Sequence, residues 1–402
     1  MTSLIERSIR SAVLLAALAL MPVVQAADAP LRARDLGVPF EGTPGACNAI
    51  TDVAGVEVGH ATLISGDGPL QMGQGPVRTG VTAIFPKGRS HSGFVRAGVF
   101  VANGTGELTG RAMIDETGLL SGPVMFTGTG SVGVVRDSVM SWYRRQLGPD
   151  PQKLFVHLLP TVGETYDGFL NDSFGQHVRQ SDVFAAMDAA RGGRVQEGAV
   201  GGGTGMIAHD FKGGIGTSSR RLSQRAGGYM VGAIVQANYG SRAQLTISGV
   251  PVGREIQDLM PSKGQRKDGS LLVVIATDAP VLPDQLRRVA LRATHGMARV
   301  GGMSGTTSGD IFLAFSTAEP GAPAGNLITA QYIDPFAMNP IFEAAVLATE
   351  EAIVNAIVAG RTMTGIDGNT VQGLPAERLQ QALRKYGRLN PVPKITAPEG
   401  CQ

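Results

Sequence analysis

Ser270 is the residue whose position most strongly indicates chemistry. It follows a polar, charged stretch, PSKGQRKDG at residues 261–269, and it opens an apolar run, LLVVIATD at residues 271–278. A serine at the first position of a buried strand, behind a charged loop, stands where a chain can cut its own backbone and expose that serine at a new N terminus. The simpler alternative is an ordinary turn residue where a surface loop enters a core strand.

Cleavage before Ser270 would supply the base that its hydroxyl needs. An unassisted hydroxyl is a weak nucleophile, whereas a free α-amine has an ordinary pKa of about 7.7–8.0 and lies within reach of the same residue's Oγ. No histidine is then required. A Ser-His-Asp triad has no local support, because the segment GMSGT at residues 302–306 fails the Gly-x-Ser-x-Gly pattern at its last position.

Neither a metal nor another cofactor is expected. The six histidines are isolated in the sequence, and there is no Cys-x-x-Cys pair, so the spacing contains no zinc signature. The glycine-rich segments 200–206 and 213–217 could bind an anion through their amides. Neither has the Gly-Lys-Ser/Thr ending of a P-loop or the Gly-x-Gly-x-x-Gly pattern that follows a strand.

The composition is that of a globular protein and argues against a nucleic-acid partner. The 402 residues are 43% hydrophobic, enough for a sizeable core in one large or two medium domains. The formal net charge is only +2 and the basic residues are scattered, so no basic stripe is available to neutralise phosphates. The 56 glycines show no fixed period and indicate tight turns and close backbone approach.

The N terminus has the pattern of an export signal. Arg7 and Arg10 precede an apolar run over residues 12–24, and small residues before Ala27 suit cleavage. The run is shorter than the roughly 18–20 residues that span a bilayer. We expect residues 1–26 to be a signal peptide and the mature protein to be periplasmic or secreted, without membrane contact. A membrane anchor is the alternative.

The two cysteines, Cys47 and Cys401, lie near opposite ends of the mature chain. Two free thiols are the commoner outcome for such a pair, and we expect that here. A disulfide is the alternative that an oxidising compartment would allow. Neither cysteine is placed to be catalytic.

Short β-branched runs bounded by glycine alternate with amphipathic segments. The pattern predicts strands at 81–85, 95–101, 229–236, 271–276 and 311–315, and helices at 284–299 and 340–359. No Pro- or Ser-rich linker separates the two halves, so strands on either side of Ser270 should share one core in a layered α/β domain. We therefore interpret residues 261–269 as a processing site and not as a domain boundary.

A set of longer motifs resembles the family of L-aminopeptidase D-Ala-esterase/amidases and β-aminopeptidases. The motifs cover nearly the whole mature chain and are NAITDVAGVEVGH at 48–60, GETYDGFLND at 163–172, GGGTGM at 201–206, FKGGIG at 211–216, VQANY at 235–239, IATDAP at 275–280 and SGDIFLAFS at 308–316. The resemblance implies a four-layered α/β/β/α fold, made as an inactive precursor that cuts itself between Gly269 and Ser270. An α chain (27–269) and a β chain (270–402) would then form one domain, assembled as a homotetramer of αβ units.

The resemblance also implies a role for each site residue. Ser270 is the nucleophile, and Ser308 with Asp310 completes its surroundings, with Asp310 in place of the glutamate that β-aminopeptidases of the family can carry. Asn238 and Tyr166 correspond to oxyanion or substrate-site residues, and Glu164 to the acid that pairs with the substrate's free amine. Read without the resemblance, these residues have ordinary alternatives: a strand-opening turn for Ser308 and Asp310, a left-handed turn for Asn238 and a surface carboxylate for Glu164.

The sequence therefore predicts an exported, self-processing aminopeptidase that removes a small N-terminal residue from peptides, amides or esters through an acyl-enzyme on Ser270. One alternative is an acyltransferase similar to the ornithine acetyltransferases, which would pass the acyl group to an amine. The other is a non-catalytic periplasmic binding protein whose glycine-rich turns line a ligand cleft.

Overall fold

The structure is a computed structural model that describes residues 32–263, 269–319, 321–324, 326–392 and 401, and the segment Leu31–Gln402 groups into one compact unit. The predicted signal peptide and residues 264–268 of the predicted processing loop lie outside the described residues. Among the described helices, none is long and apolar enough to cross a membrane.

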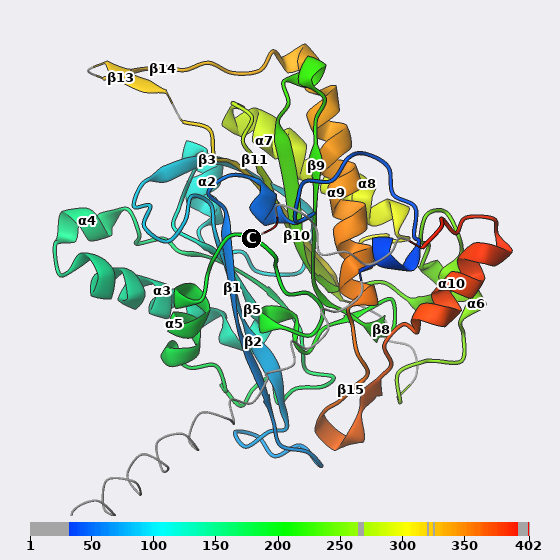
Figure 1. The fold of residues 1–402 in the computed structure, drawn as a ribbon. Helices are drawn as coiled ribbons and strands as arrows, with labels where there is room; N and C mark the ends of the chain where they lie inside the picture. The colour runs from blue at the N-terminus through cyan, green and yellow to red at the C-terminus, as the bar shows by residue number, and fades with distance from the viewer. Residues whose placement is uncertain (1–31, 264–268, 320, 325, 393–400, 402) are drawn as a thin grey trace, which may run out of the picture. The chain divides into compact units, whose positions relative to one another are not determined.

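Two β-sheets pack face to face at the centre of this unit (Figure 1). One has four strands in the order β1 (Glu57–Ser65), β2 (Val77–Phe85), β5 (Val124–Gly128) and β6 (Thr161–Thr165). The other has six, in the order β4 (Leu119–Ser121), β3 (Phe94–Gly104), β12 (Gly309–Ser316), β11 (Ser270–Thr277), β10 (Met230–Asn238) and β9 (Gly214–Arg221). Strands β5 and β6 are parallel, as are β11 and β12, and the other pairings are antiparallel.

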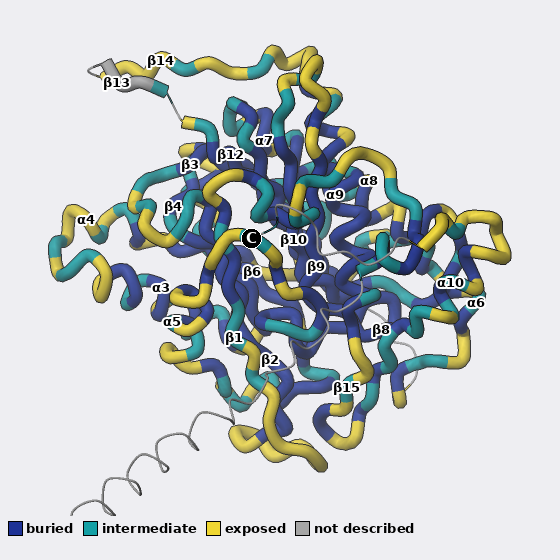
Figure 2. Tube along the Cα trace, in the orientation of Figure 1, coloured by how far each residue is buried: buried dark blue, intermediate teal, exposed yellow. Residues whose placement is uncertain are grey.

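Helices cover the outer face of each sheet and complete four α/β/β/α layers, which confirms the predicted fold class (Figure 1). Helices α3 (Val132–Leu147) and α5 (Gln180–Asp188) pack on the four-stranded sheet. Helices α7 (Pro283–Leu291) and α9 (Asn339–Val358) pack on the six-stranded sheet, and α8 (Ala293–Arg299) packs against α9. A third apolar cluster fills the space between the sheets. The central strands are accordingly buried along their length (Figure 2), which explains why they read as continuous apolar runs and not as alternating ones.

Shorter elements complete the unit. They are the helices α2 (Arg111–Thr117), α4 (Pro151–Phe155), α6 (Val252–Glu255) and α10 (Ala376–Lys385), and the strands β7 (Ile207–Ala208), β8 (Phe211–Lys212), β13 (Ala322–Ala324), β14 (Leu327–Thr329), β15 (Met363–Thr364) and β16 (Thr370–Val371).

The predicted strands are all present, within a few residues of their expected ends, and the helix predicted at 340–359 is α9. The helix predicted at 284–299 is instead two helices, α7 and α8, separated at Arg292. The Thr294 hydroxyl donates to the Leu291 carbonyl at this point. A side chain that competes for a backbone carbonyl disturbs a helix locally, and apolar periodicity does not report such competition.

The glycine-rich segments serve close packing. A Cβ atom added to Gly202 would lie 2.2 Å from the Gln236 side-chain oxygen, and one added to Gly203 would lie 2.5 Å from the Ile215 nitrogen. Because any larger residue would push the neighbouring strands apart, these glycines let the turn after residue 200 fit between the sheets.

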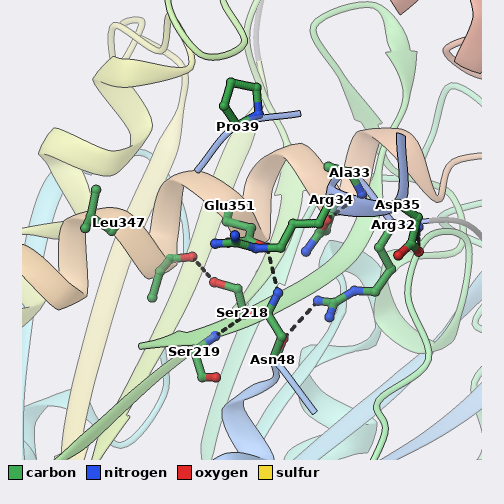
Figure 3. Close-up of polar contacts among 12 residues, drawn as sticks. Arg32, Ala33, Arg34, Asp35, Pro39, Asn48, Ser218, Ser219, Leu347 and Glu351 are labelled. Atoms are coloured by element: carbon green, nitrogen blue, oxygen red, sulfur yellow. Dashed lines mark hydrogen bonds and ion pairs between the residues drawn. The ribbon is translucent and has the colours of Figure 1, made fainter. Parts of the chain in front are cut away.

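A buried ion network ties the start of the described chain to α9 (Figure 3). Arg34 makes a two-point contact with Glu351 at 2.7 and 2.8 Å, and Arg220 reaches the same carboxylate at 2.7 Å. Burial alone would raise the pKa of Glu351, but the charges of Arg220 and Arg34 outweigh it and hold this pKa below its ordinary value. Arg32 pairs beside them with Glu197 at 2.7 Å.

The expectation of two free thiols is wrong. Cys47 and Cys401 form a disulfide with their Cα atoms 4.9 Å apart, within the range that such a bond requires. The position of Cys47 is held by hydrogen bonds, since its amide donates to Asp52 and its carbonyl accepts from Arg32. The sequence left a disulfide open as the alternative, and the fold returns the end of the chain to its start.

Candidate active site

Ser270 lies where three strands of the larger sheet begin or end. It is the first residue of β11, and the antiparallel register places it directly opposite Asn238, the last residue of β10. On its other side, the parallel register pairs Leu271 with Asp310 at the start of β12. Strand pairing thus places Ser270 opposite Asn238, where paired residues have Cβ atoms about 4.5–5.5 Å apart, and places Asp310 beside Leu271, the residue that follows Ser270.

The Ser270 hydroxyl has a partner from the next strand. Its Oγ accepts a hydrogen bond of 3.0 Å from the backbone amide of Gly309. Only 8% of the Ser270 surface is exposed. The hydroxyl is therefore held in a defined position at the rim of the sheet, next to a backbone donor.

Ser308 and Asp310 form a fixed pair beside it. The Ser308 hydroxyl donates to Asp310 Oδ1 at 2.7 Å, and the Leu271 amide donates to the same oxygen at 3.0 Å. Burial raises the pKa of Asp310, and the Ser308 hydroxyl, the Ser304 hydroxyl and the Leu271 amide act against that rise. The second oxygen, Oδ2, is buried and has no hydrogen-bond partner among the described residues.

Asn238 joins the two sheets. Its side-chain nitrogen donates to the Tyr166 carbonyl at 3.0 Å, and its side-chain oxygen accepts from the Ile207 amide at 2.9 Å. The residue is fully buried at the end of a strand, so the alternative of a left-handed turn is wrong. Both side-chain groups are engaged, which fixes the orientation of the amide between Tyr166 and Ile207.

Tyr166 follows β6 and contributes its backbone carbonyl to this arrangement. Its side chain is 45% exposed, and its hydroxyl lies against Gly168, where an added Cβ would be 2.1 Å away. The Tyr166 ring therefore lies over the backbone of the residues that directly follow it. The loop itself is anchored by the buried Asp167, which accepts hydrogen bonds from Thr79 and Ser173.

Glu164 comes from the other sheet and is buried, with 6% exposed, so the alternative of a surface carboxylate is wrong. Its Oε1 accepts from the Glu107 amide at 3.0 Å, and its Oε2 accepts from the Thr129 hydroxyl. The sheets approach closely here, because a Cβ on Gly163 would lie 2.9 Å from a Leu272 methyl. A carboxylate needs such donors when it is withdrawn from water.

Two glycines connect Glu164 with the serine. A Cβ added to Gly106 would lie 2.9 Å from the Gly309 Cα and 3.4 Å from Glu164 Oε1. Gly309 in turn donates its amide to Ser270. Glu164 and Ser270 therefore lie on either side of the contact between Gly106 and Gly309. Only the backbone of these two glycines separates them.

Sequence reasoning did not identify three of the groups found here. Thr129 bonds to Glu164, the Gly309 amide faces Ser270, and Tyr239 places a buried hydroxyl near the charge of Asp310. Burial first, and then that charge, raises the Tyr239 pKa well above its ordinary value. Tyr239 and Gly309 lie within the motifs at 235–239 and 308–316, which could have pointed to them. Thr129 lies outside these motifs and has no local signal, since it simply follows a strand.

Among the described residues, no group of three or more His, Cys, Asp or Glu side chains is arranged to hold a metal ion. A cavity of about 550 Å³ is lined by residues that include Glu41, Arg299, Glu350 and Arg388. None of its lining residues belongs to the predicted site, so it is a separate feature of the surface.

Known proteins resemble this chain over most of its length. The sequence model of peptidase family S58 matches residues 48–371. The β-peptidyl aminopeptidase BapA of Sphingosinicella xenopeptidilytica is 51% identical over 387 residues, covering 92% of this chain and 95% of the relative.

Two solved structures share the fold. The β-aminopeptidase of a Burkholderia species has a TM-score of 0.80 at 46% identity, covering 89% of this chain and 99% of that one. The L-aminopeptidase D-Ala-esterase/amidase of Ochrobactrum anthropi, described as a prototype for the serine aminopeptidases and a variant of the Ntn hydrolase fold, has a TM-score of 0.81 at 42% identity, with coverage of 89% and 99%.

Proposed function

This chain belongs to peptidase family S58 and is a serine aminopeptidase, and we propose that it is exported and activates itself by cutting the bond between Gly269 and Ser270. The observation that carries the proposal is the position of Ser270, at the start of β11 between Asn238 and the Gly309 amide. This is the position from which its hydroxyl could act first on its own chain and then on a substrate.

The packing of Gly269 supports the cleavage site. A Cβ at this position would lie 1.8 Å from the Asn238 carbonyl oxygen and 3.0 Å from the Tyr239 Cα. Only glycine fits there without displacing the backbone. The peptide bond between Gly269 and Ser270 therefore lies tightly against the end of β10. We propose that the side-chain amide of Asn238, at this strand end, stabilises the tetrahedral intermediate of the cleavage.

The self-cleavage has two balanced steps. Ser270 Oγ attacks the Gly269 carbonyl carbon, the C–N bond breaks, and the nitrogen takes up the proton to become the α-amine of Ser270. Water then adds to the resulting ester, the C–O bond breaks, and the products are a Gly269 carboxylate and a free Ser270 hydroxyl. The α and β chains, 27–269 and 270–402, stay together because β11 and β12 of the β chain lie between strands of the α chain in one sheet.

Turnover uses the same groups. The new α-amine takes the proton from Ser270 Oγ as the hydroxyl attacks the scissile carbonyl, and it returns the proton to the leaving amine. Asn238 Nδ2 supports the oxyanion, with the Tyr166 side chain as a second group at the substrate site. Hydrolysis of the acyl-enzyme then releases the N-terminal residue.

Asp310 is proposed to balance the charge of the mature N terminus. Its buried Oδ2 has no partner among the described residues of the uncut chain, and cleavage creates an ammonium group on the neighbouring strand. The parallel register of Leu271 with Asp310 places the two close together. Ser308 holds the other carboxylate oxygen, so the shorter side chain of aspartate is oriented from one side.

The proposed substrate is a short peptide, amide or ester with a small N-terminal residue and a free amine that pairs with Glu164. A β-amino acid is the first choice because relatives at 51% and 46% identity are named for β-peptide or β-amino acid cleavage. D- and L-alanine are the other candidates, given the name of the Ochrobactrum anthropi enzyme.

A kinetic panel tests this function. Wild-type protein should hydrolyse β-alanyl, D-alanyl or L-alanyl amides and should fail on their N-acetylated forms. Glu164→Gln should impair turnover of free-amine substrates and still allow self-cleavage, because the precursor presents no ammonium to Glu164. Equal activity on acetylated and free-amine substrates would overturn the role of Glu164. Transfer of the acyl group to an added amine in preference to water would favour the acyltransferase alternative.

Location and assembly complete the proposal. N-terminal sequencing of protein from its native source should begin at or near Ala27, with the enzyme in the periplasm or outside the cell. A homotetramer of αβ units is supported by exposed apolar side chains at Leu327, Ile328 and Phe336, of which Phe336 is 94% exposed. Light scattering that reports a lone αβ unit at micromolar concentration would argue against it.

A further inference from the structure

Thr129 is an exposed residue whose hydroxyl contacts the buried carboxylate of Glu164. It directly follows β5, and the parallel register of β5 with β6 pairs Thr127 with Glu164 and Gly128 with Thr165. The ends of the two strands therefore emerge together. Thr129 is exposed, whereas Glu164 behind it is buried.

The hydrogen bond between them has only one possible direction. An ionised carboxylate accepts hydrogen bonds and cannot donate them, so the Thr129 hydroxyl must give its single proton to Glu164 Oε2. The lone pairs of the hydroxyl oxygen then remain as acceptors. Because Thr129 lies on the exposed side of this contact, it can offer an acceptor to a molecule that approaches Glu164 from solvent.

The Glu164 carboxylate keeps capacity for a further donor. It receives one hydrogen bond on each oxygen, from the Glu107 amide at 3.0 Å and from Thr129. A carboxylate has about four acceptor sites, so an ammonium group can bind without displacing either donor.

We propose that Thr129 is a second ligand of the substrate's ammonium group and sets the requirement for a primary amine. The inference rests on the proposed function, in which Glu164 pairs with that ammonium. Glu164 supplies the charge, and the Thr129 hydroxyl supplies a second acceptor at a fixed angle. A primary ammonium, with three N–H donors, satisfies both, whereas a dimethylated ammonium has the same charge and a single donor.

The alternative role for Thr129 is only to orient Glu164. Substrates with β-alanyl and N,N-dimethyl-β-alanyl groups separate the two roles when they are combined with Thr129→Val, which removes the hydroxyl and keeps the branched shape. If Thr129 binds the ammonium, Thr129→Val should raise KM for the primary amine on the order of tenfold, with kcat nearly unchanged. The same substitution should change KM for the dimethylated substrate by less than about twofold. Thr129→Ser should behave as wild type with both.

Each outcome decides the inference. An equal rise in KM for both substrates would show that Thr129 only orients Glu164 and would overturn the proposal. Absence of turnover by wild-type protein with every free amine would overturn the proposed function itself, and this inference with it. If Thr129→Val is not processed, the same comparison between Thr129→Ser and Thr129→Ala gives the answer, since the two differ in the hydroxyl. Self-cleavage, followed on gels, should be the same in all processed variants.

Discussion

Cys47 and Cys401 are joined by a disulfide across 354 residues of sequence, and they lie on opposite sides of the bond between Gly269 and Ser270. In the uncut chain the bond closes one long loop. After the proposed cleavage it would link the α chain to the β chain covalently. A noncovalent pair of chains would become a single covalent molecule in an oxidising compartment.

This linkage predicts a simple gel result. Denatured mature protein should run as one species without reductant and as two chains, 27–269 and 270–402, with reductant. Cys401→Ser should give two chains under both conditions, and it should lower stability on the order of 2–4 kcal/mol. Two chains from wild-type protein without reductant would contradict the linkage.

The nucleophile is tested by substitution at Ser270. Ser270→Ala should give one uncut, folded and inactive chain, because the attacking oxygen is lost. Ser270→Cys should still cleave itself, since a thiol can make the same acyl shift, but its activity toward amides should fall. The β chain of wild-type protein should begin with Ser270 on N-terminal sequencing. Any other start, or full activity in Ser270→Ala, would end the proposal.

Gly269→Ala should slow self-cleavage at least on the order of tenfold, because the added methyl would lie 1.8 Å from the Asn238 carbonyl oxygen. The measurement is the rate of precursor loss on reducing gels. Gly133→Ala is the matched control, since a Cβ at Gly133 meets nothing within 4 Å. Processing of Gly269→Ala at the wild-type rate would show that the scissile bond is not held against β10.

The buried ion network should be sensitive to loss of its central carboxylate. Glu351→Gln leaves the Arg220 guanidinium without its charge partner, since the two side chains are 0% and 2% exposed. Removing one partner of a buried pair typically costs about 3–5 kcal/mol, to be measured by urea unfolding of the uncut Ser270→Ala protein. Glu343→Gln, at an exposed position on the same helix, should change stability by less than about 0.5 kcal/mol.

Stability should fall in mild acid because buried histidines resist protonation. Burial lowers the pKa of both His60 and His209 to about 4. Between the ordinary pKa of about 6.5 and that value, the unfolded chain binds protons that the folded chain does not. The free energy of unfolding should therefore decrease as the pH drops, by about 1.4 kcal/mol per pH unit for each histidine. His209→Gln should reduce this slope by one histidine's share in urea unfolding at pH 5 and 6. An unchanged slope would show that the pKa of His209 is not lowered by burial.

Local patterns were sufficient for the strands, whereas for Ser270 they left an ordinary turn residue as the alternative. The runs at 271–276 and 311–315 are buried on both faces, so their composition alone marked them as core strands. Ser270, Ser308 and Asp310 stand next to those runs in sequence, and the strand pairing that joins them follows from neighbouring elements. The resemblance of the longer motifs added the roles that residue types alone left open.

The contacts between distant segments were decided by tertiary structure. Residue types alone left a surface carboxylate as the alternative for Glu164, and the stacking of the two sheets buries it beside Gly106. The sequence by itself determined which runs form core strands, because composition and chain order are local properties. Only the fold decided that Thr129 meets Glu164 and that Cys47 meets Cys401, because such meetings depend on the register and stacking of segments that no local pattern encodes.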